Sequence, residues 1–167
     1  MRLHFTLVLV ALLGTACAAP AAPRSFEGVV TSVSDGDTVR VRPATGGAPV
    51  AVRLEGIDAP EICQLYGQQA REALAAQLLH QRVTVNSRRR DDYDRLLGRV
   101  SYRGSDVGAW MVERGHAWSY RHRGDAGPYA AEQSLARQAR RGLWATTGAS
   151  EPRSFRRQHG PCHGNGR

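Results

Sequence analysis

The first half of the chain carries the pattern of three consecutive β-strands. Residues 26–34 form a candidate strand, and residues 38–42 and 50–55 alternate apolar and polar side chains, as half-buried strands do. Aspartate and glycine at 35–37 and glycine at 45–47 are typical of tight turns. These segments therefore predict three consecutive strands joined by turns.

Helical periodicity begins farther along the chain. Ala70, Ala73, Leu74 and Leu78 recur at the spacing of one helix face. The remaining expected elements are a helix after Gly67, strands at 82–87 and 97–102, a helix from Ser105 or Asp106 to Gly115, and a helix from Pro128 to Gly142. Five strands with a helix after the third predict an α+β, mainly β fold, a five-stranded OB-fold barrel with three helices.

The two ends of the chain differ in character from this domain at 26–145. Residues 1–18 contain Arg2, a short apolar run and Ala16-Cys17-Ala18, which together indicate a signal peptide. Export to the periplasm or the exterior is therefore expected, with lipid anchoring at Cys17 as the alternative. Residues 19–25 read as an Ala/Pro linker and residues 146–167 as a loose basic tail.

Charge and cysteine content extend this interpretation. The formal net charge is +8, and such a basic surface attracts polyanions. Cys63 and Cys162 remain once Cys17 is cleaved off or lipidated. In an oxidising compartment they are expected to form one disulfide, and two unpaired thiols are the alternative.

Four short segments concentrate the residue types that phosphodiester hydrolysis needs. They are Asp-Gly-Asp-Thr at 35–38, Arg-Leu-Glu-Gly-Ile-Asp-Ala-Pro-Glu at 53–61, Tyr-Gly at 66–67 and Tyr-Asp-Arg-Leu-Leu-Gly at 93–98. In this order and spacing they resemble the staphylococcal nuclease family, from about Phe26 to Trp144. The resemblance implies a calcium-dependent nuclease that cleaves DNA and RNA without sequence specificity and leaves 3′-phosphate ends.

The acidic residues of these segments suit a hard cation, which prefers oxygen ligands. By resemblance, Asp37, Asp58 and the backbone carbonyl of Ala59 are calcium ligands, and Asp35 orients the turn and the water around the ion. Few protein ligands imply weak calcium binding without substrate. The plainer alternative is that Asp35 and Asp37 only shape a turn and that Asp58 only caps Pro60.

Two arginines and one glutamate complete the expected catalytic set. Arg53 and Arg95 are candidate phosphate clamps, because a guanidinium donates two parallel hydrogen bonds and stays charged. Glu61 is the candidate general base, or orients the attacking water, three residues after Asp58. Arg53 and Glu61 could instead be ordinary exposed surface residues. Arg95 is chosen by its match to the family pattern over its basic neighbours, which are Arg88, Arg89, Arg90 and Arg99.

Two tyrosines are candidate substrate-binding residues. By resemblance Tyr93 binds a terminal phosphate through its hydroxyl, and Tyr120 either stacks on a base or packs against the barrel. The chain departs from the family pattern at Asp92, where a basic residue is common, and at Asp94, where glycine is usual. Both changes are expected to affect phosphate binding beside Arg95.

Two further hypotheses come from other functional classes. The domain could be a non-catalytic nucleic-acid-binding module of the same fold, although the full set of charged residues argues against this. Alternatively, His159, Cys162 and His163 could bind zinc or copper in the tail. No other run is apolar enough to span a membrane, and the protein is expected to be a monomer.

Overall fold

A computed structural model describes residues 24–121, 124–160 and 162 of the protein. The expected signal peptide, Cys17, most of the linker and His163 lie outside the described residues. Arg24 and Ser25, which were expected in the linker, belong to the first strand and pair with Ser87 and Asn86. No helix in the described part of the chain is long and apolar enough to cross a membrane.

Six strands form the main sheet, in the order β3-β2-β1-β5-β6-β7, and two short strands pair separately. Their bounds are β1 Arg24–Asp35, β2 Thr38–Pro43, β3 Val50–Leu54, β4 Ile57–Asp58, β5 Arg82–Arg90, β6 Leu96–Tyr102, β7 Ser105–Asp106 and β8 Trp118–Ser119. Neighbouring strands run antiparallel, and β4 pairs with β8. The predicted strands are therefore present, with shifts of a few residues at their ends.

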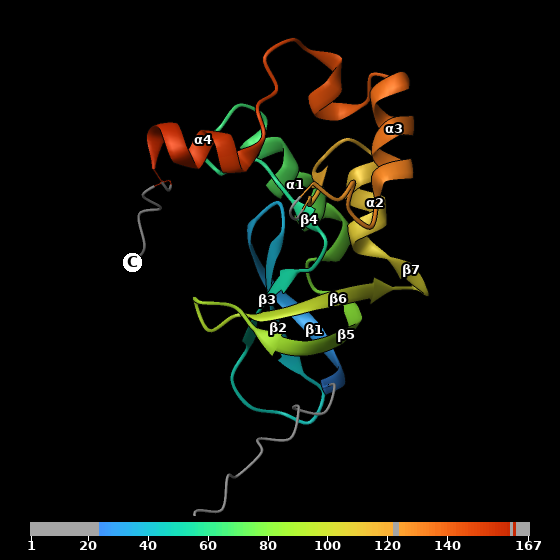
Figure 1. Cartoon of the computed structure of the whole chain (residues 1–167). Coiled ribbons are helices and arrows are strands. Elements are labelled where there is room, and N and C mark those ends of the chain that lie inside the picture. The colour runs from blue at the N-terminus through green and yellow to red at the C-terminus, as the bar shows by residue number, and fades with distance from the viewer. Residues whose placement is uncertain (1–23, 122–123, 161, 163–167) are drawn as a thin grey trace, which may run out of the picture.

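The sheet closes on itself because β3 also pairs with β6, in parallel, with Val52 opposite Leu96. This closure of β1, β2, β3, β5 and β6 confirms the predicted OB-fold barrel (Figure 1). Inward-facing aliphatic residues such as Val30, Val39 and Val85 have no exposed surface. Their burial stabilises the barrel by about 25 cal/mol per Å² of apolar surface removed from water.

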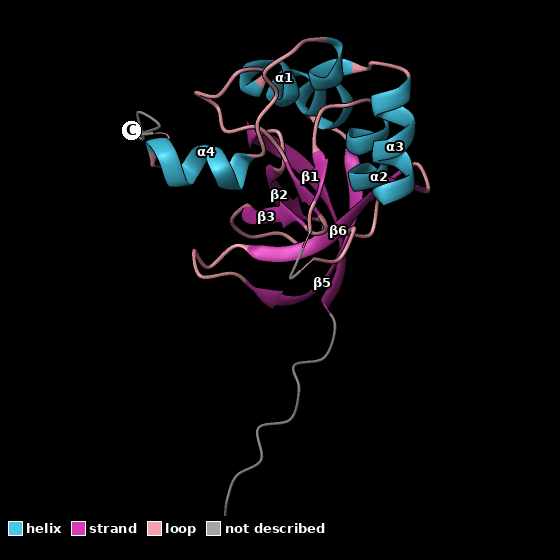
Figure 2. Ribbon diagram, turned by 45° about the horizontal axis from the view of Figure 1, so that its top comes forward, coloured by secondary structure: helices cyan, strands magenta, loops and turns pink. Residues whose placement is uncertain are grey.

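The helices gather at one end of the barrel, and α4 lies apart from α2 and α3 (Figure 2). Their bounds are α1 Gly67–Leu78, α2 Val107–Glu113, α3 Ala130–Gln138 and α4 Pro152–His159, with a 3-10 turn at Gly142–Ala145. The expected third helix begins at Ala130 rather than Pro128. Tyr129 stays outside it because its N–H donates to Ser119 Oγ and its hydroxyl to Asp106.

The expectations of three helices and a loose tail were wrong, because residues 152–159 form α4. Pro152 begins this helix, where a missing N–H costs nothing, and Gly160 ends it with φ 73°. The predicted disulfide between Cys63 and Cys162 is present and joins residues 99 positions apart. It anchors the chain directly after α4 to the loop between β4 and α1.

Candidate active site

Most of the predicted site residues line one cavity of about 330 Å³. The β1–β2 turn supplies Asp35 and Asp37, and β3 supplies Arg53. The full lining is Asp35, Asp37, Arg53, Ala59, Pro60, Glu61, Tyr93, Arg95 and Arg156. Asp58 borders it through bonds to two of these arginines, Arg53 and Arg156. Segments far apart in sequence thus meet in one charged hollow.

Asp37 is buried and fully engaged by its neighbours. Its Oδ1 accepts from the Thr38 hydroxyl at 3.1 Å, and its Oδ2 accepts from the Ala59 N–H at 2.9 Å. Burial acts to raise the pKa of Asp37, but the Arg53 guanidinium and these hydrogen bonds together hold it below the ordinary value. Asp37 therefore remains a carboxylate at neutral pH.

Arg53 bridges the two expected cation ligands. Its guanidinium forms ion pairs with Asp37 and, at 3.1 Å, with Asp58 Oδ1, while only 14% of its side chain is exposed. Burial nevertheless raises the pKa of Asp58 above its ordinary value, against the opposing charges of Arg53 and Arg156. Arg53 is thus held in place by the carboxylates of Asp37 and Asp58.

Asp35 lies at the rim of the same carboxylate group. Its Oδ1 accepts from the Asp37 N–H at 3.0 Å, which fixes the turn between β1 and β2. Burial and the nearby charge of Asp37 raise the pKa of Asp35 to about 7. A cation beside this pair would relieve the repulsion that keeps Asp35 partly protonated.

The donor chemistry fits a hard divalent cation that is only partly ligated by protein. Asp37 and Asp58 offer carboxylate oxygens that meet at Arg53, and Ala59, the third expected ligand, lines the same cavity. Among the described residues, no three side chains of His, Cys, Asp or Glu converge as in a closed metal centre. Water and substrate would therefore supply most ligands of an ion held here.

Arg95 reaches the cavity from the β5–β6 hairpin. Its Nη1 donates to the Thr38 hydroxyl at 3.2 Å, and its guanidinium pairs with Asp91 at 2.8 Å. It also lies 5.3 Å from the centre of the Tyr93 ring, which is 81% exposed. Asp94 adopts φ 60°, the left-handed region that glycine adopts most readily, and pairs with Arg90 instead of Arg95.

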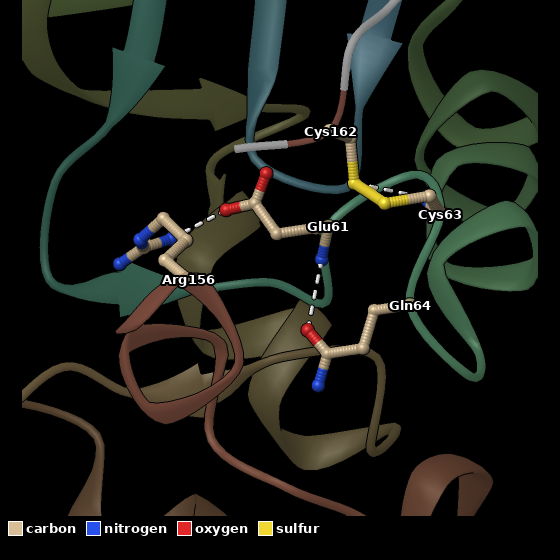
Figure 3. Close-up of a disulfide and its surroundings, with 5 residues drawn as sticks. All are labelled: Glu61, Cys63, Gln64, Arg156 and Cys162. Carbon is tan, nitrogen blue, oxygen red and sulfur yellow. Dashed lines mark hydrogen bonds and ion pairs between the residues drawn. A yellow bond between two sulfur atoms is a disulfide. The ribbon is translucent and has the colours of Figure 1, made fainter. Parts of the chain in front are cut away.

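Glu61 has a partner that sequence reasoning missed. Arg156 of α4 donates to Glu61 Oε1 at 2.5 Å and to Asp58 Oδ2 at 3.3 Å (Figure 3). The sequence did hold a signal for this helix, since Glu151-Pro152 is a typical helix start and Gly160 a typical stop. Arg156 is therefore a third arginine in the cavity, beside the predicted Arg53 and Arg95.

Two other expectations have mixed outcomes. Tyr120 is 40% exposed and does not line the carboxylate cavity; it lines an adjoining cavity that shares Arg53 and Arg156 with it. The proposed zinc or copper site in the tail is contradicted for Cys162, because its sulfur is bonded to Cys63. The ring of His159 packs 4.6 Å from that of Phe155.

Comparison with known proteins identifies the family. The sequence model described as "Staphylococcal nuclease homologue" matches residues 51–146, more than half of the chain. The chain is 40% identical to a micrococcal nuclease of Shigella flexneri, with 79% of this chain and 81% of that one covered. It is 37% identical to Protein ParB of Escherichia coli, with 94% of each covered, and 34% identical to an uncharacterized endonuclease of Haemophilus influenzae, with 77% and 72% covered. The chain therefore belongs to the staphylococcal nuclease family and is an enzyme of this nuclease class.

Proposed function

We propose that this protein is an exported, calcium-dependent nuclease that hydrolyses phosphodiester bonds of DNA and RNA and leaves 3′-phosphate ends. The observation that carries the proposal is the shared cavity, where Glu61 and the aspartates face Arg53 and Arg95. Carboxylates alone would repel a phosphodiester, and arginines alone would only bind it. Together they supply a base, a cation site and phosphate donors.

Each charged group has a definite task in this reaction. The Glu61 carboxylate accepts a proton from water as the water oxygen attacks phosphorus, and the bond to the 5′-oxygen breaks as that oxygen takes a proton from solvent water and leaves as a hydroxyl. Arg53 and Arg95 donate to the non-bridging oxygens, on which negative charge increases in the transition state. Calcium, held by Asp37, Asp58 and the Ala59 carbonyl, would neutralise phosphate charge when bound.

The net charge supports nucleic acids as the substrate, and the cysteines support export. The net charge of +8 favours polyanions, and bonding to phosphate oxygens implies no sequence specificity. The Cys63–Cys162 disulfide and the signal-like segment at 1–18 support export. Sequencing the N-terminus of protein recovered from a producing cell tests this, with a start near Ala19 expected. Recovery of an intact Met1 would contradict export by cleavage, and a lipidated Cys17 would indicate anchoring.

Product analysis tests the activity itself. End-labelled single-stranded DNA and RNA are incubated with mature protein and calcium, and the new ends are identified. We expect cleavage at many sequences with 3′-phosphate and 5′-hydroxyl products. Products with 5′-phosphate ends would overturn the assigned direction of attack. Tight binding of the nucleic acid without cleavage would instead support the alternative that the protein is a non-catalytic nucleic-acid-binding module.

A further inference from the structure

The C-terminal helix α4 brings an arginine to the proposed general base from outside the family-matched segment 51–146. Arg156 Nη1 lies 2.5 Å from Glu61 Oε1, whereas its contacts with Asp58 are longer, at 3.3 and 3.4 Å. Glu61 is therefore its principal partner. Figure 3 shows the guanidinium approaching one oxygen of the carboxylate, with the other oxygen pointing away.

Two links hold the ends of α4 against the loop that carries Glu61, and a third bond fixes Glu61 within that loop. The Cys63–Cys162 disulfide fixes the chain just after the helix, and Gln64 Nε2 donates to the Ser150 carbonyl at 2.6 Å just before it. The same Gln64 accepts the Glu61 N–H at 3.2 Å through its Oε1 (Figure 3). The backbone of Glu61 and both ends of α4 are thereby tied into one unit.

The contact differs from an ordinary surface ion pair. The Glu61 side chain is 24% exposed and that of Arg156 is 36% exposed, whereas the Arg82–Glu27 pair is more than 60% exposed on both sides. A partly buried, anchored guanidinium restricts carboxylate rotation more than a mobile surface pair does. Among the described residues, Glu61 Oε2 accepts no hydrogen bond and remains available to water.

We propose that Arg156 is a positioning residue for the nuclease reaction. Arg156 holds the Glu61 carboxylate by Oε1 so that Oε2 faces the attacking water. The Cys63–Cys162 disulfide fixes the end of α4 and so keeps the Arg156 guanidinium beside Glu61. The inference rests on the proposed function, because it assigns Glu61 the task of accepting the water proton. Through Arg156, helix α4 would then support the active site and would not be a dispensable tail.

The first test compares kcat and KM on a single-stranded oligonucleotide at saturating calcium, using the full oxidised chain. For Arg156→Gln we expect kcat to fall roughly 10- to 100-fold, the order expected for a misplaced catalytic group. We expect KM to change by less than about threefold, because the ground-state phosphate contacts remain. Arg156→Lys should recover part of kcat, since it keeps the charge but loses the planar fork.

Arg157→Gln is the matched control, because it removes the same charge from the same helix. Arg157 donates to Ser154 Oγ and to no carboxylate of the cavity. Its kcat should equal that of the unsubstituted protein. An equal loss in both variants would overturn the inference in favour of a general effect of charge. A higher kcat for Arg156→Gln would also overturn the inference, because it would show that Arg156 obstructs the active site.

A double-substitution cycle tests whether Arg156 acts through Glu61. In a Glu61→Gln background, the further change Arg156→Gln should leave the residual rate unchanged, because no base remains to be oriented. Independent, multiplied losses would contradict the positioning role. An unsubstituted protein that cleaves nothing would contradict the proposed function and this inference with it, whereas equal rates for it and Arg156→Gln would contradict the inference alone.

Reduction tests the tether. A thiol reductant, or the Cys63→Ser, Cys162→Ser double variant, should lower kcat of the otherwise unsubstituted protein toward that of Arg156→Gln. The Arg156→Gln protein should be insensitive to reduction, since it has no guanidinium to release. The same fractional loss in both proteins would overturn the assigned link. Thermal unfolding of each sample shows whether the barrel stays folded during the measurement.

Discussion

The Asp91 carboxylate anchors Arg95 by both backbone and side chain. Asp91 Oδ1 accepts from the Arg95 N–H at 3.0 Å, and Oδ2 accepts from Arg95 Nε at 2.8 Å. Burial acts to raise the pKa of Asp91, but these hydrogen bonds dominate and hold its pKa below the usual value. The guanidinium of Arg95, the proposed phosphate clamp, is thus held by a residue four positions earlier in the same hairpin.

Asp91→Asn should therefore misplace Arg95 while sparing the turn. The Asn Oδ1 can still accept the backbone N–H groups, but the charged partner of the guanidinium is lost. We expect kcat/KM to fall by roughly tenfold, the order of one charge-assisted hydrogen bond. Glu27→Gln removes one negative charge at an exposed position outside the cavity, so it is the control and should leave the rate unchanged. Similar losses in both variants would contradict the anchoring role.

Arg53→Gln should strongly destabilise the calcium-free protein. The change leaves Asp37 and Asp58 buried without the guanidinium that bridges them. Removing one partner of a buried ion pair costs about 3–5 kcal/mol. Urea unfolding in chelator should show this loss, and added calcium should recover part of it. Arg40→Gln, on the exposed face of β2, is the control and should leave the stability unchanged. If calcium does not restore any stability to Arg53→Gln, this argues against a cation at these carboxylates.

Gly67→Ala should displace the Glu61 loop. A Cβ on Gly67 would lie 1.9 Å from the carbonyl oxygen of Glu61, which is backbone and has little room to move. Alanine favours a helix over glycine by about 1 kcal/mol, but such overpacking typically costs 1–3 kcal/mol, so we expect lower stability. Cleavage should also slow, because Glu61 shifts. Gln68→Ala at the next, exposed position serves as control, and an active, stabilised Gly67→Ala protein would contradict the placement of this loop.

The stability of the calcium-free protein should depend on pH through Asp35. Folded Asp35 keeps its proton up to a pKa of about 7, whereas in the unfolded chain it loses the proton near the ordinary aspartate pKa of 3.8. The unfolded state therefore binds fewer protons in this window, so the free energy of unfolding falls as pH rises from 4 to 7. The Asp35→Asn protein lacks this titration and is the reference. Compared with it, the free energy of unfolding should fall by a few kcal/mol, at about 1.4 kcal/mol per pKa unit. If the free energies of unfolding of the two proteins changed in parallel with pH, the raised pKa of Asp35 would be contradicted.

The barrel and the site residues of the barrel were predictable because their signals are local. Alternation marks β2 and β3 directly, and Asp37, Arg53 and Asp58 stand at fixed spacing in short motifs. The closure of β3 on β6 was implied only by fold type, since parallel pairing leaves no mark in either strand.

The contribution of α4 could not be derived from composition. Residues 152–159 are strongly polar, and their helix is held by distant groups: a disulfide partner 99 positions away and carboxylates more than 90 positions away. The local signals, Pro152 at the start and Gly160 at the end, mark a short helix, but they do not show which distant groups hold it. The orientation of Arg95 was likewise hidden, because nothing distinguishes Asp91 from Asp92 in sequence.

We propose that cleavage requires a cation held at Asp37 and Asp58. The most direct measurement is the rate of single-stranded DNA cleavage across a calcium series and in chelator, for the unsubstituted protein, Asp37→Asn and Glu61→Gln. We predict a saturable rise with calcium, no cleavage in chelator, and loss of the calcium response in Asp37→Asn. Cleavage that persists in chelator and is absent from Glu61→Gln would contradict the account.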